Sequence, residues 1–361
     1  MNFIRKNIFT LALITSLMGI LPTTLTAATT VRAALDIGSG ATKLRVAEVD
    51  LETNKIVNIL ESKSFTTPYQ EKLSKSPEGV FDNEAMDIGM NSLKESIEIA
   101  KKHGAEKVIA VATAAFRKAK NSEAFIQRIY DQTGIVVNVI DQGLEGELAF
   151  KAVQSQFGVQ PSNLIVWDIG GGSLQLTTAD HKGDLIIYRG NEASTPFKNF
   201  VIAEIQDKEI NHINTPNPLN VKEIMQANAH AQRLAQKVDL VIKEKINAPQ
   251  TIIVGVGNIF GYQLTSMFDN QKHFTRDGLV GAVANLAGKS DHDVGGGDFA
   301  NVYVTNAALI LGFMEGLDIN HMQITDINPA DGAFFYAPFW EKQMMANCCK
   351  VSNRSVCKCE E

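Results

Sequence analysis

The chain has 361 residues, of which 45% are hydrophobic and 20% are charged, a composition typical of a folded globular protein rather than a disordered one. Its formal net charge of −6 at pH 7 excludes a nucleic-acid binder held by overall positive charge, so a polyanionic ligand must be met by a local basic cluster. The length allows two domains of ordinary size.

The first 28 residues have the pattern of a cleavable signal peptide. Arg5 and Lys6 precede an apolar run over residues 8–21, and a pair of alanines follows at positions 27–28. The run is shorter than the ~18–20 residues of a membrane-spanning helix. We therefore expect export to the periplasm or the exterior, with no stable membrane span after cleavage. An uncleaved anchor is the alternative.

The first half of the chain predicts a three-stranded meander followed by alternating helices and strands. Apolar runs and alternating patterns mark the strands, Asp82 is a suitable helix N-cap, and Gly104 and Gly134 are suitable helix ends. The expected strands cover residues 31–35, 43–49, 55–65, 108–111 and 136–140, and the expected helices cover residues 82–104, 122–132 and 145–157.

The second half repeats this order of elements. Strands are expected over residues 163–167, 184–189 and 251–254, one long helix from the cap Asn220 to Ile246, an irregular stretch over residues 291–297, and a helix over residues 299–316 capped by Asp298. The repetition indicates two mixed sheets with helices on their faces. We place the domains at residues 31–160 and 161–340, after a leader at 1–28 and before a tail at 341–361.

The tail holds all four cysteines of the chain: Cys348, Cys349, Cys357 and Cys359. An exported protein favours disulfides, and a bond between the two vicinal cysteines is strained. We therefore expect one of the two cross-pairings. A soft-metal site is the alternative.

The most specific feature is a duplicated strand–turn–strand unit. The first copy contains Asp36-Ile-Gly-Ser-Gly40 and the second contains Asp168-Ile-Gly-Gly-Gly-Ser173. An alternating stretch follows the glycines in both copies, which excludes a Rossmann fingerprint, and no Gly-Lys-Ser/Thr is present for a P-loop. Backbone N–H groups in such a turn can close around a phosphate. The predicted phosphate-binding residues are Asp36, Gly38, Ser39, Gly40, Thr42, Asp168, Gly170, Gly171, Gly172 and Ser173.

Asp36 and Asp168 are also the predicted metal ligands. Each lies at the end of a buried strand, so a carboxylate from each half can face the same cleft. Two carboxylates beside a phosphate suit Mg²⁺, which keeps several waters and needs few protein ligands.

Two further segments carry candidate polar groups. Arg117 follows the strand at residues 108–111, where its guanidinium can bind phosphate oxygens in a bidentate manner, although a solvated arginine fits equally well. Glu145 and Glu147 stand at the start of a helix, where a carboxylate can activate water. Acidic residues are common in a first helical turn without any function, and the residues alone do not choose between these two.

Together these motifs resemble the exopolyphosphatase / guanosine pentaphosphate phosphohydrolase (Ppx/GppA) family, part of the actin, sugar-kinase and heat-shock ATPase superfamily. Their order and spacing carry the resemblance over residues 31–339. The resemblance implies an α/β protein with two actin-like, ribonuclease-H-like domains whose mixed sheets surround a central cleft. It also implies Mg²⁺-assisted hydrolysis of a terminal phosphoanhydride.

The resemblance assigns roles to individual residues. Glu145 matches the family's general base, and Arg117 matches its phosphate-binding arginine. Gly255 and Gly257 fall in the superfamily's third, nucleotide-side glycine motif, so the resemblance adds them to the predicted phosphate-binding residues.

Three departures from the family pattern stand out. Gly40 and Ala41 replace a polar pair of the first turn, and Gln175 replaces a glutamate; a glutamine can position water but cannot take its proton. The C-terminal acidic-arginine motif of the family is represented only by Asp326 and Asp331 with their neighbours. The altered loops resemble those of the secreted apyrases, including Thr42 in the first loop.

We therefore expect an exported Mg²⁺-dependent hydrolase with Glu145, Gln175 and Arg117 as catalytic residues. Inorganic polyphosphate is the first choice of substrate and nucleoside polyphosphates are the second. A non-catalytic phosphate- or nucleotide-binding protein is the alternative from another class. No nucleic-acid partner is expected, and a homodimer is left open.

Overall fold

The computed structural model describes residues 29–352. The predicted signal peptide at residues 1–28 lies outside the described residues, as do Cys357 and Cys359 and the side chains of Cys348 and Cys349. Across the described part of the chain, no helix has both the length and the apolar character needed to cross a membrane.

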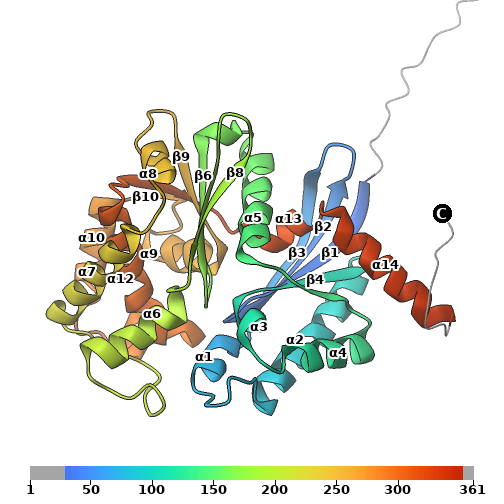
Figure 1. The fold of residues 1–361 in the computed structure, drawn as a ribbon, viewed down its shortest axis with the longest axis horizontal. Coiled ribbons are helices and arrows are strands. Elements are labelled where there is room, and N and C mark those ends of the chain that lie inside the picture. Colours follow the sequence, from blue (N-terminus) through green and yellow to red (C-terminus); the bar gives the residue numbers. More distant parts are fainter. Residues whose placement is uncertain (1–28, 353–361) are drawn as a thin grey trace, which may run out of the picture.

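The first lobe contains a five-stranded sheet in the order β3-β2-β1-β4-β5 (Figure 1). β1, β2 and β3 form the predicted antiparallel meander, and β4 and β5 run parallel to β1. Its strands are β1 (Thr29–Ile37), β2 (Ala41–Asp50), β3 (Lys55–Thr66), β4 (Val108–Ala112) and β5 (Val137–Val139), and its helices are α1 (Tyr69–Ser74), α2 (Asn83–Lys102), α3 (Ala114–Lys118) and α4 (Ser122–Thr133).

The second lobe contains a six-stranded sheet in the order β10-β11-β9-β6-β7-β8. Its meander, β6–β7–β8, repeats the geometry of the first lobe. The strands are β6 (Leu164–Ile169), β7 (Leu174–Ala179), β8 (Leu185–Gly190), β9 (Ile252–Val256), β10 (His273–Thr275) and β11 (His321–Ile324). The helices are α6 (Ser194–Phe200), α7 (Val221–Ala235), α8 (Leu240–Ile246), α9 (Thr265–Met267), α10 (Arg276–Ala284), α11 (Asp291–Val294) and α12 (Ala300–Gly316).

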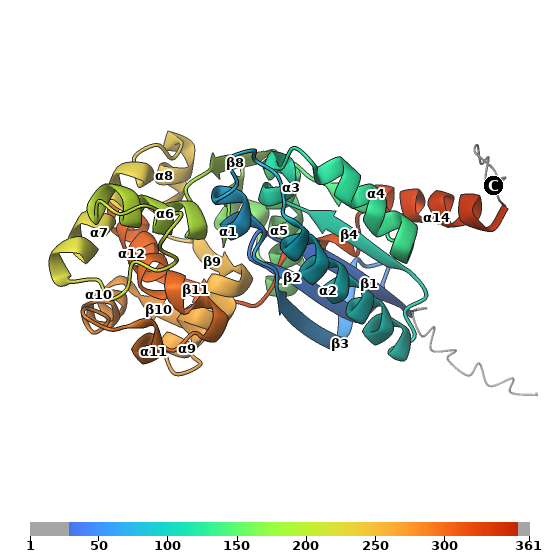
Figure 2. The ribbon, with the colours of Figure 1, turned by 90° about the horizontal axis from the view of Figure 1, so that it is seen from below.

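Three helices cross between the halves of the sequence. α5 (Gln142–Phe157) packs Phe150 and Val153 against Val166 and Val254 of the second sheet. α13 (Pro329–Ala333) packs against the first sheet, and α14 (Ala337–Ser352) extends from the first lobe away from the second (Figure 2). The strands of the two sheets divide between β5 and β6, but packing joins α5 to the second lobe and α13 and α14 to the first.

The predicted long helix over residues 220–246 is wrong. α7 ends at Ala235 and α8 begins at Leu240. The break allows Val238, which is 3% exposed, to enter the core of the second lobe. Lys243 Nζ donates to the Gln236 carbonyl oxygen at 2.7 Å, which satisfies an acceptor that the end of a helix leaves free.

The prediction that Asp298 caps α12 is also wrong. The N-cap position is Phe299, and Asp298 Oδ2 instead accepts a hydrogen bond of 2.8 Å from Thr66 Oγ1 of the first lobe. The preceding stretch is partly ordered into α11 and a 3₁₀ turn, Gly297–Phe299. The carboxylate of Asp298 therefore binds Thr66 of the first lobe instead of capping the N-terminus of α12.

Candidate active site

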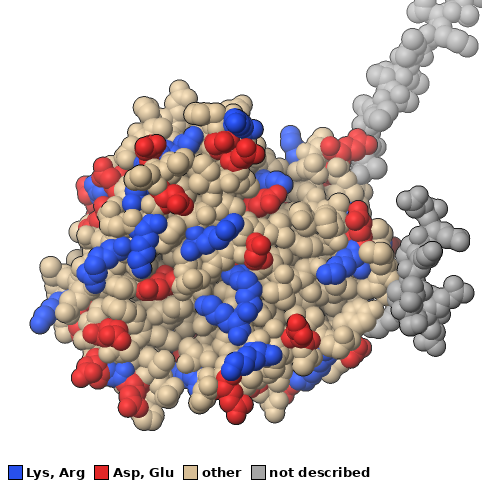
Figure 3. Space-filling view, viewed as in Figure 1, with Lys and Arg blue, Asp and Glu red and all other residues tan. Residues whose placement is uncertain are grey.

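A cavity of ≈ 640 Å³ lies between the two lobes and is lined by both glycine turns. Asp36, Lys43, Glu145 and Asp168 face it together. On the face drawn in Figure 3, basic side chains are interspersed with acidic ones. Inside the cleft, Lys43 provides local positive charge of the kind that a polyanion requires.

The first turn joins β1 to β2 as a tight hairpin. Gly38 N donates to Ala41 O at 2.9 Å, and a Cβ on Gly38 would stand only 2.8 Å from that oxygen. Ser39 Oγ accepts from the backbone N–H of Ala115 at 3.1 Å. The predicted strand–turn–strand geometry is confirmed for this copy.

The second turn has the same construction and faces the first. Gly170 N donates to Ser173 O at 2.9 Å. A Cβ on Gly171 would stand 3.0 Å from both Gly40 N and Ser39 Cβ. Glycine at 171 is therefore required for the close approach of the two turns, and the lobes are closed on each other at this point.

Lys43 is the site residue that the sequence reasoning missed. Its Nζ donates to Asp36 Oδ2 at 2.9 Å. Burial would lower the pKa of Lys43, but the charges of Asp36 and Asp168 outweigh it and raise that pKa. The hairpin register pairs Lys43 directly with Asp36, so side chains at these two positions share one face of the sheet. This register was the available signal.

The carboxyl group of Asp168 has a strongly perturbed pKa. Burial raises the pKa of Asp168 to about 7; the charge of Lys43 opposes this shift, and the charge of Asp36 adds to it. A Cβ on Gly257 would stand 3.0 Å from Asp168 Oδ1, and Gly257 has a φ of +82°. Gly257 thus allows the backbone of the third motif to approach this carboxylate.

Glu145 is placed by the capping of α5. Asp141 Oδ1 accepts from Leu144 N at 2.8 Å, which fixes Glu145 in the first turn, where it is 5% exposed and faces the cavity. Burial is the main cause that raises the pKa of Glu145 to about 8; Arg117 opposes the shift, and the charges of Asp168 and Asp36 add to it.

The structure separates Glu145 from Glu147. Arg117 donates to Glu145 Oε2 at 2.9 Å and, through its other terminal nitrogen, to Ser173 Oγ at 3.1 Å. Glu147 is instead paired with Lys151 on the outer side of the same helix. Arg117 lies in the short helix α3 rather than in a loop, and its contacts connect the first lobe to α5 and to the second turn.

Several predicted site residues lie behind the cavity rather than on its wall. Thr42 is fully buried, with its hydroxyl 3.2 Å from that of Thr67. Gln175 Nε2 donates to Ser173 Oγ at 3.4 Å, and its buried Oε1 has no hydrogen-bond partner in the described structure. A Cβ on Gly255 would stand 2.4 Å from the Phe260 ring, which explains that glycine by packing. Direct phosphate binding by Thr42 and Gly255, and a catalytic role for Gln175, stay predictions.

The carboxylates of the cleft fit a Mg²⁺ ion only together with a phosphate ligand. Asp36 Oδ1 is buried without a hydrogen-bond partner among the described residues, and Asp168 faces the same cavity. Within residues 29–352 no group of three or more His, Cys, Asp or Glu side chains is arranged to hold a metal. Mg²⁺ commonly uses one or two carboxylates with phosphate oxygens and waters, which this pair satisfies.

The fold and the site define an α/β protein with two mixed sheets around a cleft. Residues 33–187 of the chain match the model of the Ppx/GppA phosphatase family. The predicted family and fold class are thereby confirmed.

Curated relatives match the same part of the chain. The bifunctional 3-dehydroquinate synthase/phosphatase of Fusobacterium nucleatum is 33% identical over 161 residues, which are 42% of this chain and 23% of that protein. Exopolyphosphatase 1 of Mycobacterium leprae is 33% identical over 143 residues, which are 40% of this chain and 41% of the relative. The matched segments thus span less than half of each relative.

Solved structures match over most of the chain. The Ppx/GppA enzyme of Aquifex aeolicus has a TM-score of 0.65 at 19% identity, covering 85% of this chain and 99% of that one. An exopolyphosphatase from Cytophaga hutchinsonii has a TM-score of 0.67 at 19% identity, covering 85% and 97%. At this identity the likeness establishes the fold.

Proposed function

We propose that this protein is a Mg²⁺-dependent phosphoanhydride hydrolase that releases the terminal phosphate of inorganic polyphosphate. The observation that carries the proposal is the position of Glu145, buried on the cavity wall between two facing glycine turns and held there by Arg117. The names of the curated relatives, which include exopolyphosphatases, support the choice of substrate.

In this proposal, different residues of the cleft bind the phosphates, supply positive charge and accept the proton. Backbone N–H groups of the two turns bind the terminal phosphates, and Lys43 supplies positive charge beside Asp36. Glu145 accepts a proton from water as the water oxygen bonds to phosphorus. The bridging P–O bond breaks, and its electron pair stays on the shortened chain.

Arg117 and Asp36 with Asp168 have supporting roles in this scheme. Arg117 orients Glu145 and neutralises charge near Ser173. Asp36 and Asp168 would hold Mg²⁺ together with phosphate oxygens of the substrate. The bound ion would neutralise negative charge on these oxygens. Gln175, hydrogen-bonded to Ser173, would keep that hydroxyl oriented.

A specific observation favours nucleoside polyphosphates as the second candidate substrate class. Tyr262 lines the same cavity and is 53% exposed, which leaves a ring available for stacking on a nucleobase. Asn306 also lines the cavity, and its buried Oδ1 has no hydrogen-bond partner within the described residues. An amide acceptor and an aromatic ring on the wall of one cavity suit a base with N–H donors.

Phosphate release from the purified chain tests the proposal. We expect Mg²⁺-dependent release from polyphosphate, with a higher kcat/KM than for ATP, ADP or guanosine pentaphosphate. A higher kcat/KM for a nucleotide would replace the first substrate by the second. Binding of phosphate chains without any release, with or without Mg²⁺, would leave a binding protein instead.

The activity should rise with pH. Because burial raises the pKa of Glu145 to about 8, this carboxyl group is mostly protonated at neutral pH and cannot take a proton from water. We expect kcat/KM, which reports the free enzyme, to increase through pH 7 and reach half its plateau near pH 8. A profile that is flat between pH 6 and 9 would contradict Glu145 as the base.

We also propose that the protein acts outside the cytoplasm, supported by the leader-like pattern of residues 1–28. Sequencing the N-terminus of exported protein checks this; cleavage near residues 27–28 is the expected result.

A further inference from the structure

Phe299 of the second lobe lies against the first phosphate turn. The residue lines the cavity and is 37% exposed. Its ring atom Cε1 stands 3.9 Å from the position that a Cβ on Gly40 would occupy; apart from Gly40 and its two chain neighbours, no other atom of the described residues lies within 4 Å of that position. The ring therefore covers the turn at the point where Gly40 has no side chain.

Gly40 is not required by its backbone conformation. It is absent from the glycines with positive φ, and a Cβ there would meet no backbone atom of the described chain within 4 Å beyond its immediate neighbours. A methyl group would just reach van der Waals contact with the ring, and a longer side chain would need the space that the ring fills. Gly40 and Phe299 thus form a complementary pair across the cleft.

The segment that carries Phe299 has its own anchors. Residues 295–297 are three successive glycines with φ of +71°, +84° and +53°, a conformation that other residues rarely adopt. A Cβ on Gly296 would stand 2.8 Å from the Tyr303 ring. Thr66 Oγ1 donates to Asp298 Oδ2 across the lobes at 2.8 Å. These contacts hold the residue before Phe299 against the first lobe, so the ring is kept over the turn.

We propose that Phe299 is a specificity-determining residue whose ring, seated over Gly40, admits the end of an unbranched phosphate chain and hinders substrates with a bulky group next to the terminal phosphates. The inference rests on the proposed function, because it names which phosphoanhydrides reach the site. The ring offers no hydrogen bond to phosphate, so its effect is steric. It narrows the space around the first turn and excludes water from it.

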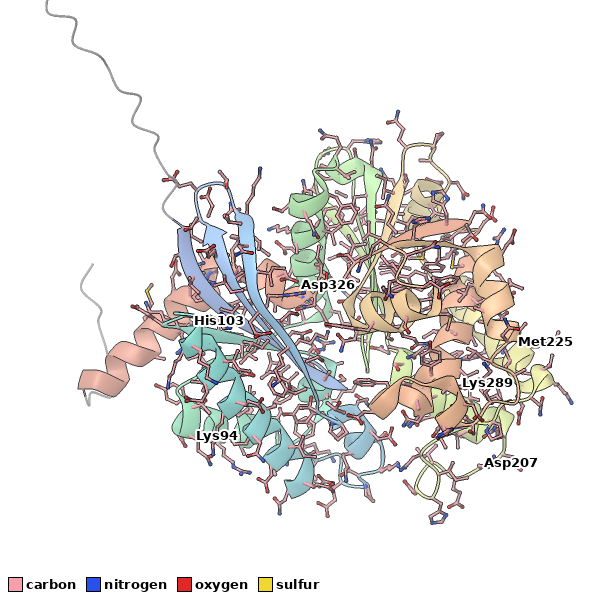
Figure 4. All side chains as sticks on the ribbon, turned by 180° about the vertical axis from the view of Figure 1, so that it is seen from behind. Lys94, His103, Asp207, Met225, Lys289 and Asp326 are labelled. Carbon is pink, nitrogen blue, oxygen red and sulfur yellow. The ribbon has the colours of Figure 1, made fainter. Side chains whose placement is uncertain are left out.

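Phe299→Ala is expected to relax this selection. The ratio of kcat/KM for tripolyphosphate over that for ADP should fall about tenfold, a change of the size expected when one apolar contact decides selection. Met225→Ala is the matched control, because Met225 is 67% exposed on α7, on the outer side of the second lobe (Figure 4). It should leave the ratio unchanged. An unchanged ratio in Phe299→Ala would overturn the proposal.

A double-mutant cycle tests the pair directly. Gly40→Ala, Gly40→Ser and Gly40→Asn should weaken tripolyphosphate binding progressively, by about tenfold for the largest side chain, as a measure of crowding in the pocket. In the Phe299→Ala background the same series should be nearly flat. Additive effects in the two backgrounds would contradict the inference.

The readout separates this inference from the proposed function. Binding of tripolyphosphate is measured by calorimetry in a Glu145→Gln background, so no turnover interferes, and thermal unfolding confirms that each variant is folded. Failure of the wild-type chain to bind or cleave any phosphate chain would reject the proposed function. If the chain binds and cleaves phosphate chains but the effects of the Gly40 and Phe299 substitutions are additive, only the role of Phe299 would be rejected.

Discussion

Glu145→Gln is expected to lower kcat for phosphate release by about 10²–10⁴-fold, the usual contribution of a positioned general base. The substitution removes the proton acceptor but keeps the size of a side chain that is 5% exposed. Above the raised pKa of Glu145, which is about 8, it also removes a negative charge 2.9 Å from Arg117, so less negative charge opposes the phosphate. Substrate binding should therefore be retained or tightened, and the loss should appear in kcat rather than in KM.

Glu147→Gln is the matched control. Glu147 lies two residues further along α5, its side chain is 32% exposed, and it pairs with Lys151 outside the cleft. The same chemical change there should leave kcat within about twofold of the wild type, as for a surface substitution. Equal losses in the two variants would indicate damage to α5, and turnover retained in Glu145→Gln would remove Glu145 from the mechanism.

The glycine turns could be predicted from sequence because their signals are local. A buried strand, a carboxylate, a glycine turn and an alternating strand occupy consecutive positions, and both copies are formed as expected. The choice of Glu145 over Glu147 came from a family resemblance; the structure supports it by burial and by the Arg117 contact. Spacing alone gave no such preference, since both glutamates fit the first turns of a helix.

Other features depend on contacts between distant segments and were therefore missed. α5 follows the first sheet in sequence, but its apolar face fits the second sheet. Asp298 is a good cap by type, yet Thr66 of the other lobe takes its carboxylate. Lys43 has the sequence pattern of an ordinary strand residue. Only its register opposite Asp36 places its side chain on the same face of the sheet as that carboxylate.

Asp326 and Asp331, which represent the family's C-terminal acidic-arginine motif in this chain, form ion pairs with an arginine of β2. Arg45 is 3% exposed, donates to Asp326 O at 2.8 Å, and its Nε lies 3.0 Å from Asp331 Oδ1. Burial raises the pKa of Asp331 while Arg45 opposes that shift. Asp326 lies where the two lobes meet (Figure 4). Arg45 thus fastens the first sheet to the segment that returns from the second lobe.

Arg45→Met is expected to lower the free energy of unfolding by about 3–5 kcal/mol, because it leaves the carboxylate of Asp331 buried without its charge partner. Urea unfolding followed by circular dichroism measures the change. Arg276→Met is the matched control: Arg276 pairs with Asp318, whose side chain is 68% exposed, and such surface pairs contribute about 0–1 kcal/mol.

The double variant Arg45→Met/Asp331→Asn distinguishes an unpaired charge from lost packing. If the buried charge causes the loss, removing that charge as well should restore part of the stability, and the double variant should be more stable than Arg45→Met alone. The amide introduced by Asp331→Asn keeps a side-chain oxygen for the Asn328 N–H, which Asp331 Oδ2 accepts at 2.9 Å, so the start of α13 is preserved. A double variant less stable than Arg45→Met would show that the aliphatic stem of Arg45 and the fit of Asp331, rather than their charges, hold this junction.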